Sequence, residues 1–183
     1  MNSKTADFAG LKIFYREAGD PSQPTIVLLH GFPSSSYSFH DLIPLLAGRF
    51  HVIAPDYPGM GYSEAPPPTV LRPTFDDMVG AIDAFIAHCA PGPVILYMHD
   101  IGGPIGMRIA TAHPDRIAGL IFQNFTISIE GWNPERLKAY EQLTLPLVDY
   151  YGARGRLIEV NGDQPVEAVA AQMFGALENV NRL

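Results

Sequence analysis

The stretch "VILYMHDIGGPIG", Val94 to Gly106, joins an unbroken apolar run to a glycine-rich segment, with Asp100 at the junction. The run predicts a buried strand, and the spacing of the apolar residues that follow predicts a helix from Gly103 to Ala112. This spacing is that of a nucleophile elbow, in which a sharp turn lifts one side chain above a sheet. A carboxylate there is kept ionised by the helix N-terminus and can attack carbon to form an ester. The alternative is that Asp100 only caps the helix.

Strand and helix signals alternate on both sides of this turn. Strand signals fall at Leu11 to Glu17, Thr25 to Leu29, residues 50–56, Val94 to Met98 and Ile117 to Phe122, and helix signals at Tyr37 to Leu46 and in the segment that Thr74 caps. Apolar strands joined by helices pair in parallel and carry helices on both faces. The sequence therefore predicts an α/β fold with a doubly wound, mostly parallel sheet.

The pattern changes after residue 124. Two helical segments are expected, at about Pro134 to Leu145 and Pro165 to Asn179, with only weak strand signals such as "RLIEV". We therefore expect a core at residues 1–124 and a helical, cap-like segment at residues 125–183. Without later strands, the strand Ile117 to Phe122 would present an open edge, which invites dimers or aggregates.

Charge and composition exclude several classes of function. Lys and Arg number 12 against 19 Asp and Glu, a net charge of −7, which disfavours nucleic acid and anionic membrane surfaces as partners. The N-terminus lacks the features of a signal peptide, and no apolar run has the length of a membrane span, so a cytoplasmic protein is expected. The single Cys89 is expected to be a buried thiol at a helix end. No ligand spacing indicates a metal, and no motif indicates a cofactor.

Three motifs carry a resemblance to a known family. They are "LLHGFPSSSYSF" at residues 28–39, "APDYPGMGYSEAP" at 54–66 and "YMHDIGGPIGMRIA" at 97–110. In this order they resemble the oxyanion loop, the loop after the next strand and the elbow of the α/β-hydrolase superfamily, over nearly all of Leu11 to Asn124. The resemblance implies an α/β-hydrolase fold with a partial helical cap and with its last strands missing.

The resemblance also implies roles for individual residues. Asp100 would be the nucleophile. The backbone amides of Phe32 and Ile101 would form the oxyanion hole, which stabilises negative charge in the transition state. His30 and Gly31 would support the loop that carries Phe32. His99 is interpreted as a packing residue at the turn in preference to a group that transfers protons.

An Asp in the elbow narrows the resemblance to enzymes that form alkyl esters, chiefly epoxide hydrolases and dehalogenases, which act on small apolar organic substrates. The segment His30 to Pro33 matches both epoxide hydrolases and fluoroacetate dehalogenases. Haloalkane dehalogenases usually have Asn in place of Phe32 and Trp in place of Ile101, whereas fluoroacetate dehalogenases have Arg beside the nucleophile. Met98 looks more like a haloalkane dehalogenase residue. On balance an epoxide-type substrate is favoured.

The catalytic acid and histidine of the family have no evident counterpart. No histidine follows His113, and Asn124 stands where some members have the acid; Glu130 is close in sequence, but nothing positions it. The sequence is thus expected to be a truncated hydrolase, or else a binding protein that keeps the scaffold without catalysis. In epoxide hydrolases two cap tyrosines donate to the epoxide oxygen; Tyr140, Tyr150 and Tyr151 are the candidates, although packing is the favoured interpretation.

Overall fold

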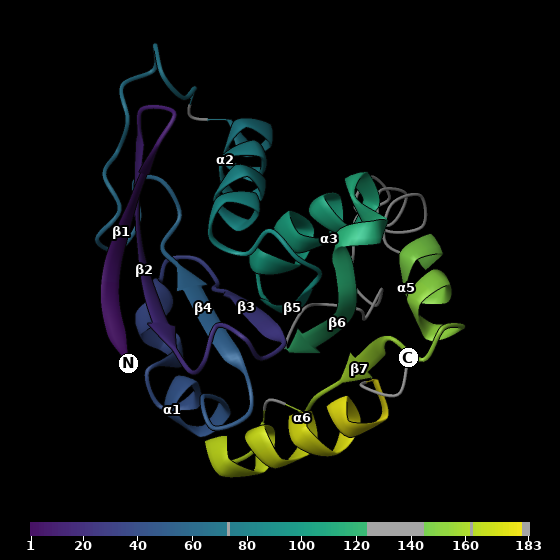
Figure 1. Cartoon of the computed structure of the whole chain (residues 1–183). Coiled ribbons are helices and arrows are strands. Elements are labelled where there is room, and N and C mark those ends of the chain that lie inside the picture. Colours follow the sequence, from purple (N-terminus) through teal and green to yellow (C-terminus); the bar gives the residue numbers. More distant parts are fainter. Residues whose placement is uncertain (73, 124–144, 162, 181–183) are drawn as a thin grey trace.

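A sheet of seven strands forms the centre of the computed structural model, which describes residues 1–72, 74–123, 145–161 and 163–180 (Figure 1). The order across the sheet is β1-β2-β4-β3-β5-β6-β7. The strands are β1 (Asn2–Phe8), β2 (Leu11–Ala18), β3 (Thr25–Leu29), β4 (His51–Pro55), β5 (Val94–His99), β6 (Ile117–Gln123) and β7 (Leu157–Glu159). From β4 to β7 every pairing is parallel, whereas β1 and β2 are antiparallel additions. The predicted doubly wound, mostly parallel sheet is confirmed.

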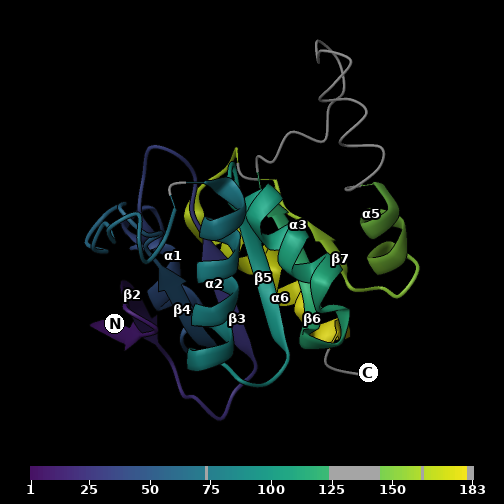
Figure 2. The ribbon, with the colours of Figure 1, turned by 90° about the horizontal axis from the view of Figure 1, so that it is seen from above.

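Helices cover both faces of the sheet. They are the short 3-10 helices η1 (Ser36–Phe39) and η2 (Pro114–Arg116), and the α-helices α1 (Leu42–Leu46), α2 (Phe75–Cys89), α3 (Gly102–Ala112), α5 (Leu145–Gly152) and α6 (Val166–Val180). One face packs against α2 and α3, and the other against α1 and α6 (Figures 1 and 2). Alternate residues of β5 therefore enter two different apolar clusters: Leu96 belongs to the first and Tyr97 to the second.

The helix expected at Tyr37 to Leu46 is divided into η1 and α1. Pro44 lies within this segment and has no backbone N–H. In a continuous helix that position would donate to the carbonyl of His40, and the proline ring would crowd the same carbonyl. A single helix is therefore disfavoured at this place, and two short turns take its position.

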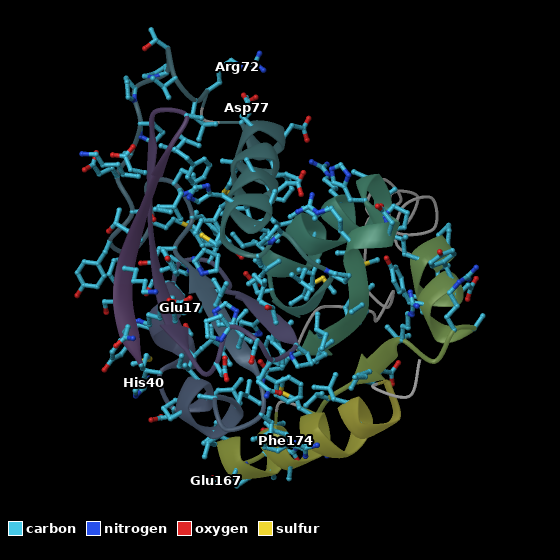
Figure 3. All side chains as sticks on the ribbon, in the orientation of Figure 1. Glu17, His40, Arg72, Asp77, Glu167 and Phe174 are labelled. Atoms are coloured by element: carbon cyan, nitrogen blue, oxygen red, sulfur yellow. The ribbon has the colours of Figure 1, made fainter. Side chains whose placement is uncertain are left out.

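The first strand of the sheet was not predicted. β1 pairs with β2 along its whole length through a hairpin that turns at Ala9 and Gly10, both of which have positive φ, 50° and 76°. Most of its side chains are exposed, so its sequence lacks the apolar pattern of a buried strand. Thr74 does cap α2 as expected: its hydroxyl accepts from the Asp77 N–H at 3.2 Å (Figure 3 shows Asp77 beside Arg72 at this helix end).

The later part of the chain differs from the expected cap-like segment. Strand β7 pairs with β6 over Leu120 to Phe122, so the strand predicted at Ile117 to Phe122 is not the edge of the sheet, and β7 occupies that position instead. Helix α6 buries Val169, Met173 and Leu177 against α1 and the sheet. The apolar spacing predicts helix α6 correctly, but it does not predict where the helix packs. An amphipathic helix can bury its apolar face against a cap or against the core of the sheet.

Several expectations concern residues outside the described part of the chain. They are nearly all of the helix at Pro134 to Leu145, together with Asn124, Glu130 and Tyr140. Within the described residues, no helix combines the length and the apolar character needed to cross a membrane. Cys89 is half-buried at the end of α2, and burial raises the pKa of its thiol to about 11.

If α6 belongs to the cooperative core, shortening one of its buried side chains lowers the stability of the whole chain. We expect Met173→Ala to lower the free energy of unfolding by about 2–5 kcal/mol, because Met173 is fully buried. Glu167→Ala, on the exposed side of the same helix (Figure 3), should change it by less than about 0.5 kcal/mol. Urea unfolding followed by circular dichroism measures both, and equal effects of the two substitutions would contradict this placement of α6.

A charged network ties β1 to β2 and β4. The Glu17 side chain, 15% exposed, contacts the Lys4 ammonium and lies 2.8 Å from His51 Nε2. The other ring nitrogen of His51 lies 3.1 Å from the Thr25 hydroxyl. Burial by itself would raise the pKa of the Glu17 carboxyl, but the hydrogen bonds from Lys4 and His51 outweigh it and lower that pKa below its ordinary value of 4.5.

The lowered pKa of Glu17 makes stability dependent on pH. A carboxyl whose pKa is lower in the folded state stabilises the fold fully above its ordinary pKa and loses this contribution as pH falls through the folded value. We therefore expect the free energy of unfolding to decrease as the pH is lowered beyond about 4.5. Glu17→Gln should lower the free energy of unfolding at pH 7 by about 1 kcal/mol, and it should weaken the decrease at acid pH, here called the acid limb. Urea titrations between pH 7 and pH 3.5 test this, and an unchanged acid limb in Glu17→Gln would refute it.

Candidate active site

Asp100 lies on a tight turn between β5 and α3. Its φ is 52°, a left-handed conformation that residues other than glycine seldom adopt. The turn also brings α3 very close to two strands: a Cβ on Gly102 would lie 2.4 Å from the Leu29 carbonyl oxygen of β3, and one on Gly106 would lie 2.5 Å from the Met98 Sδ of β5. The glycines are therefore required by the close packing of helix on strand, as the elbow spacing predicted.

The carboxylate of Asp100 meets the loop that follows β3. The Phe32 backbone N–H donates to Asp100 Oδ1 at 2.8 Å. A Cβ on Gly31 would lie 2.7 Å from Asp100 Cβ, so only glycine allows this approach. Ile101 follows directly, with helical φ and ψ, at the start of α3. Asp100 is exposed, and among the described residues no donor contacts its second oxygen, Oδ2.

His30 fixes the loop from within the core. Its Nδ1 lies 2.8 Å from the Gly31 carbonyl oxygen, and its Nε2 accepts from the Tyr57 N–H at 3.4 Å. The imidazole stacks on the Tyr57 ring with centroids 3.9 Å apart, and the Tyr57 hydroxyl donates to the His30 carbonyl at 2.8 Å. Burial lowers the pKa of His30, although the Gly31 carbonyl and Asp56 oppose the shift. A neutral ring with its hydrogen on Nδ1 satisfies both contacts, so His30 is occupied and cannot reach a substrate.

Asp56 holds two loops of the site together, a role that the sequence did not predict. It is fully buried, and its two oxygens accept from the Ser36 N–H at 2.6 Å and from the Tyr62 N–H at 2.8 Å. A Cβ on Gly61 would lie 2.1 Å from Asp56 Oδ2. Asp56 thus binds the two loops that flank the site to each other. The sequence pattern that indicates this role is a carboxylate at the end of a buried strand, followed by a glycine-rich turn.

His99 and a neighbouring cavity lie on the face that α1 and α6 cover. His99 Nδ1 lies 3.2 Å from the Gln123 carbonyl oxygen, and the Tyr97 hydroxyl donates to the Gln123 side chain. The cavity measures about 300 Å³. It is lined by Ser38, Phe39, Asp41, Leu42, Tyr97, His99, Gln123, Gln164, Val166 and Val169. The contact with Gln123 is consistent with packing at the turn, and it leaves the second ring nitrogen of His99 without a described partner.

The tyrosines of the later segment separate into two environments. Tyr151 is fully buried in the cluster that includes α3, and burial raises its pKa to about 12. Tyr150 is 38% exposed, and the Arg154 guanidinium lies 3.6 Å from its ring centroid. Tyr151 is therefore packed within the core. Among the described residues there is also no group of three or more His, Cys, Asp or Glu side chains placed to hold a metal ion.

Comparison with known proteins agrees with the fold. Residues 24–149 match the family model of the α/β hydrolase fold, and the chain belongs to this family. It is 43% identical over 139 residues to an uncharacterized hydrolase of Saccharomyces cerevisiae, covering 72% of this chain and 47% of the relative. It is 33% identical over 129 residues to a haloalkane dehalogenase of Bradyrhizobium diazoefficiens, and this match covers 70% of this chain and 41% of the relative.

The solved structures include relatives of a second activity. An epoxide hydrolase from Vigna radiata superposes with a TM-score of 0.62 at 29% identity, covering 84% of this chain and 47% of that one. The chain thus spans less than half the length of each of these relatives. Membership of the α/β hydrolase fold family is established by this similarity.

The space around two glycines predicts opposite effects on stability when each is replaced by alanine. Gly102 lies where α3 packs on β3, and Gly80 lies in open space on α2. Gly102→Ala places a Cβ against backbone, so we expect unfolding to become easier by about 3 kcal/mol or the chain to fail to fold. Gly80→Ala, on the exposed side of α2 with open space around it, should stabilise the chain by about 0.5–1 kcal/mol. Thermal unfolding compares the two; a neutral Gly102→Ala would show that the close approach is not needed.

Proposed function

We propose that this chain carries the ester-forming half of an α/β hydrolase, with Asp100 as the nucleophile. One observation carries the proposal: Asp100 Oδ1 is held by the Phe32 N–H, while Oδ2 has no described donor and the residue is exposed. An ionised oxygen that no donor occupies is the group that attacks an electrophilic carbon. A carboxylate that served only as a helix cap would instead accept from the amides of its own helix, and Asp100 accepts from a different loop.

The amides of Phe32 and Ile101 are proposed to stabilise the negative charge that develops on Oδ1 when the ester is later attacked. Donors fixed in advance by the fold are worth a few kcal/mol in such a transition state. His30 and Gly31 support this arrangement without touching the substrate. The buried His30 side chain contacts the Gly31 carbonyl oxygen and so holds the loop, and the missing side chain of Gly31 leaves room for Asp100.

The proposed substrate is a small apolar molecule with an electrophilic carbon, and an epoxide is favoured over a haloalkane. The segment His30 to Pro33 supports the epoxide, as does the absence of polar side chains at Phe32 and Ile101 that could hold a departing halide. The curated relative from Bradyrhizobium is a haloalkane dehalogenase, which keeps the halide as a second candidate. The non-enzymatic alternative is a protein that binds such molecules without reacting.

Covalent labelling tests the proposal. In epoxide opening, a carboxylate oxygen bonds to the ring carbon, the carbon–oxygen bond breaks, and the alkoxide takes a proton, so the whole probe is added. We expect one equivalent of styrene oxide to add to the folded chain in intact-mass spectrometry, with the label on the peptide that contains Asp100. Asp100→Asn should remove the label, because an amide is a poor nucleophile.

Matched controls separate the possible outcomes. Asp115→Asn alters a carboxylate at the far end of α3 and should leave labelling unchanged. A 1-haloalkane probe that labels Asp100 faster than styrene oxide, adding only its alkyl group, would reverse the substrate preference. A folded chain that binds both probes and reacts with neither would contradict the enzymatic proposal and favour the binding protein.

A further inference from the structure

We propose that a row of side chains around Arg16 is a docking surface for an extended peptide that carries one carboxylate between two apolar residues. The row, here called the aromatic row, consists of Tyr62, Phe14, Arg16, Tyr37 and His40. The proposal does not depend on the chemistry proposed for Asp100. It rests on the unpaired charge of Arg16, on the two rings beside that charge and on the exposure of the row.

The contacts of the aromatic row are continuous. Phe14 and Arg16 are alternate residues of β2, so their side chains point to the same face of the sheet. The Arg16 guanidinium carbon lies 5.5 Å from the Phe14 ring centroid and 5.4 Å from the Tyr37 centroid. Each ring contacts a further ring: Tyr62 lies 5.0 Å from Phe14. Tyr37 stacks on His40, which Figure 3 labels, with centroids 4.5 Å apart.

Arg16 has no anionic partner among the described residues, and its buried Nε has no hydrogen-bond acceptor there. Other basic side chains in this part of the chain pair with carboxylates; they are Lys4, Lys12, Arg72, Arg108 and Arg116. A guanidinium presents a planar fork of N–H donors that fits a carboxylate through two parallel hydrogen bonds. The contacts with aromatic rings satisfy the charge of Arg16 in part but leave this fork without an acceptor. A carboxylate supplied by a partner is the group that fits it.

The aromatic row is open to solvent. Tyr62 is 73% exposed and Tyr37 is 58% exposed, while Phe14 and Arg16 are half-buried. The next residue on the same face of β2, Ala18, is buried in the cluster that contains α1. The row therefore begins where the helical cover of this face ends. Exposed tyrosines beside an arginine are also the residue types that contribute most of the binding energy in protein interfaces.

The spacing of the rings selects an extended peptide. In an extended chain, residues two apart point to the same side and lie about 6.7 Å from each other. The Arg16 guanidinium lies at a similar step from each of its two rings. In the described part of the chain Phe14 and Tyr37 make no ring contact with each other, so the cation lies between two separate rings. An acidic residue at position i of the peptide, with apolar residues at i−2 and i+2, matches this order.

The charges near the ends of the aromatic row limit the partner to one carboxylate. Glu64 follows Tyr62 closely in the chain and pairs with Lys12 at 3.2 Å. Asp41 lies 3.2 Å from His40 Nε2 at the other end. Further carboxylates on a bound peptide would be repelled by these groups, and the net charge of −7 acts in the same direction. A segment with one acidic residue and apolar neighbours is therefore favoured over a polyacidic one.

The aromatic row includes side chains from both loops that Asp56 joins. Tyr37 follows Ser36 in the chain, and the backbone N–H groups of Ser36 and Tyr62 both donate to Asp56. A peptide that contacts Tyr37 and Tyr62 together would join the same two loops from the outside. The docking surface would thereby stabilise the loops that flank the candidate active site.

Fluorescence anisotropy with the full chain tests the proposal. The probe is the labelled peptide Gly-Leu-Ser-Glu-Ser-Leu-Gly, and a second probe has Gln in place of Glu. We expect saturable binding of the first probe and at least about 10-fold weaker binding of the second. Arg16→Lys keeps the charge but loses the planar fork, and should weaken binding by about 10-fold. Arg72→Lys, the same change beside Asp77 (Figure 3), should leave binding unchanged.

A second variant keeps the test decisive if Arg16→Lys does not fold. Tyr37→Ser removes an exposed ring, should preserve the circular dichroism of the wild type, and should weaken binding by about 5-fold. Equal binding of the Glu and Gln probes overturns the proposal, and so does a folded chain that shows no saturable binding up to about 2 mM probe. Acetate that displaces the probe as well as unlabelled peptide does would leave no role for the rings. A phosphoserine probe that binds about 10-fold more tightly than the Glu probe, or wild-type dimers that Tyr37→Ser dissociates, would assign the row to a different partner.

Discussion

The parallel pairing of β3 with β5 is the constraint on which the candidate site depends. Leu29 lies opposite Met98 in this register, so the loop that begins at His30 emerges beside the turn at Asp100. Both loops leave the same edge of the sheet, as parallel strands require. A slip of one residue would move every side chain of the strand to the other face and separate the Phe32 amide from the carboxylate. The close contact of Gly102 with the Leu29 carbonyl locks the register, because the helix fits the strand at one position only.

Two carboxylates at this edge show how environment separates structural from chemical roles. Asp56 is buried, and both of its oxygens accept backbone hydrogen bonds, so its charge is used to hold loops together. Asp100 is exposed and has one oxygen held and one without a described donor. The two residues have the same chemistry and similar positions after buried strands. Burial and the number of donors around each one distinguish a fixed acceptor from a proposed nucleophile.

The later part of the chain completes the face of the sheet that α1 leaves uncovered. Phe174 of α6 stacks on Phe50 with ring centroids 5.9 Å apart, and β7 extends the sheet beyond β6 (Figures 1 and 3). Burial of apolar surface on this face is what supports the strands beneath it. The same arrangement forms the cavity beside His99, since Gln164, Val166 and Val169 form one of its walls.

The sequence by itself determined the alternation of strands and helices, the turn at Asp100 and the glycine positions around it. These features are written in local patterns: apolar runs, helical spacing and residues that tolerate close approach. It did not determine that β1 forms, that β7 and α6 join the core, or which side chains surround Asp56 and His99. Those features depend on contacts between distant segments, such as Gln123 with His99 and Ser36 with Asp56. Apolar spacing tells which face of an element is buried, but only the assembled sheet decides what that face is buried against.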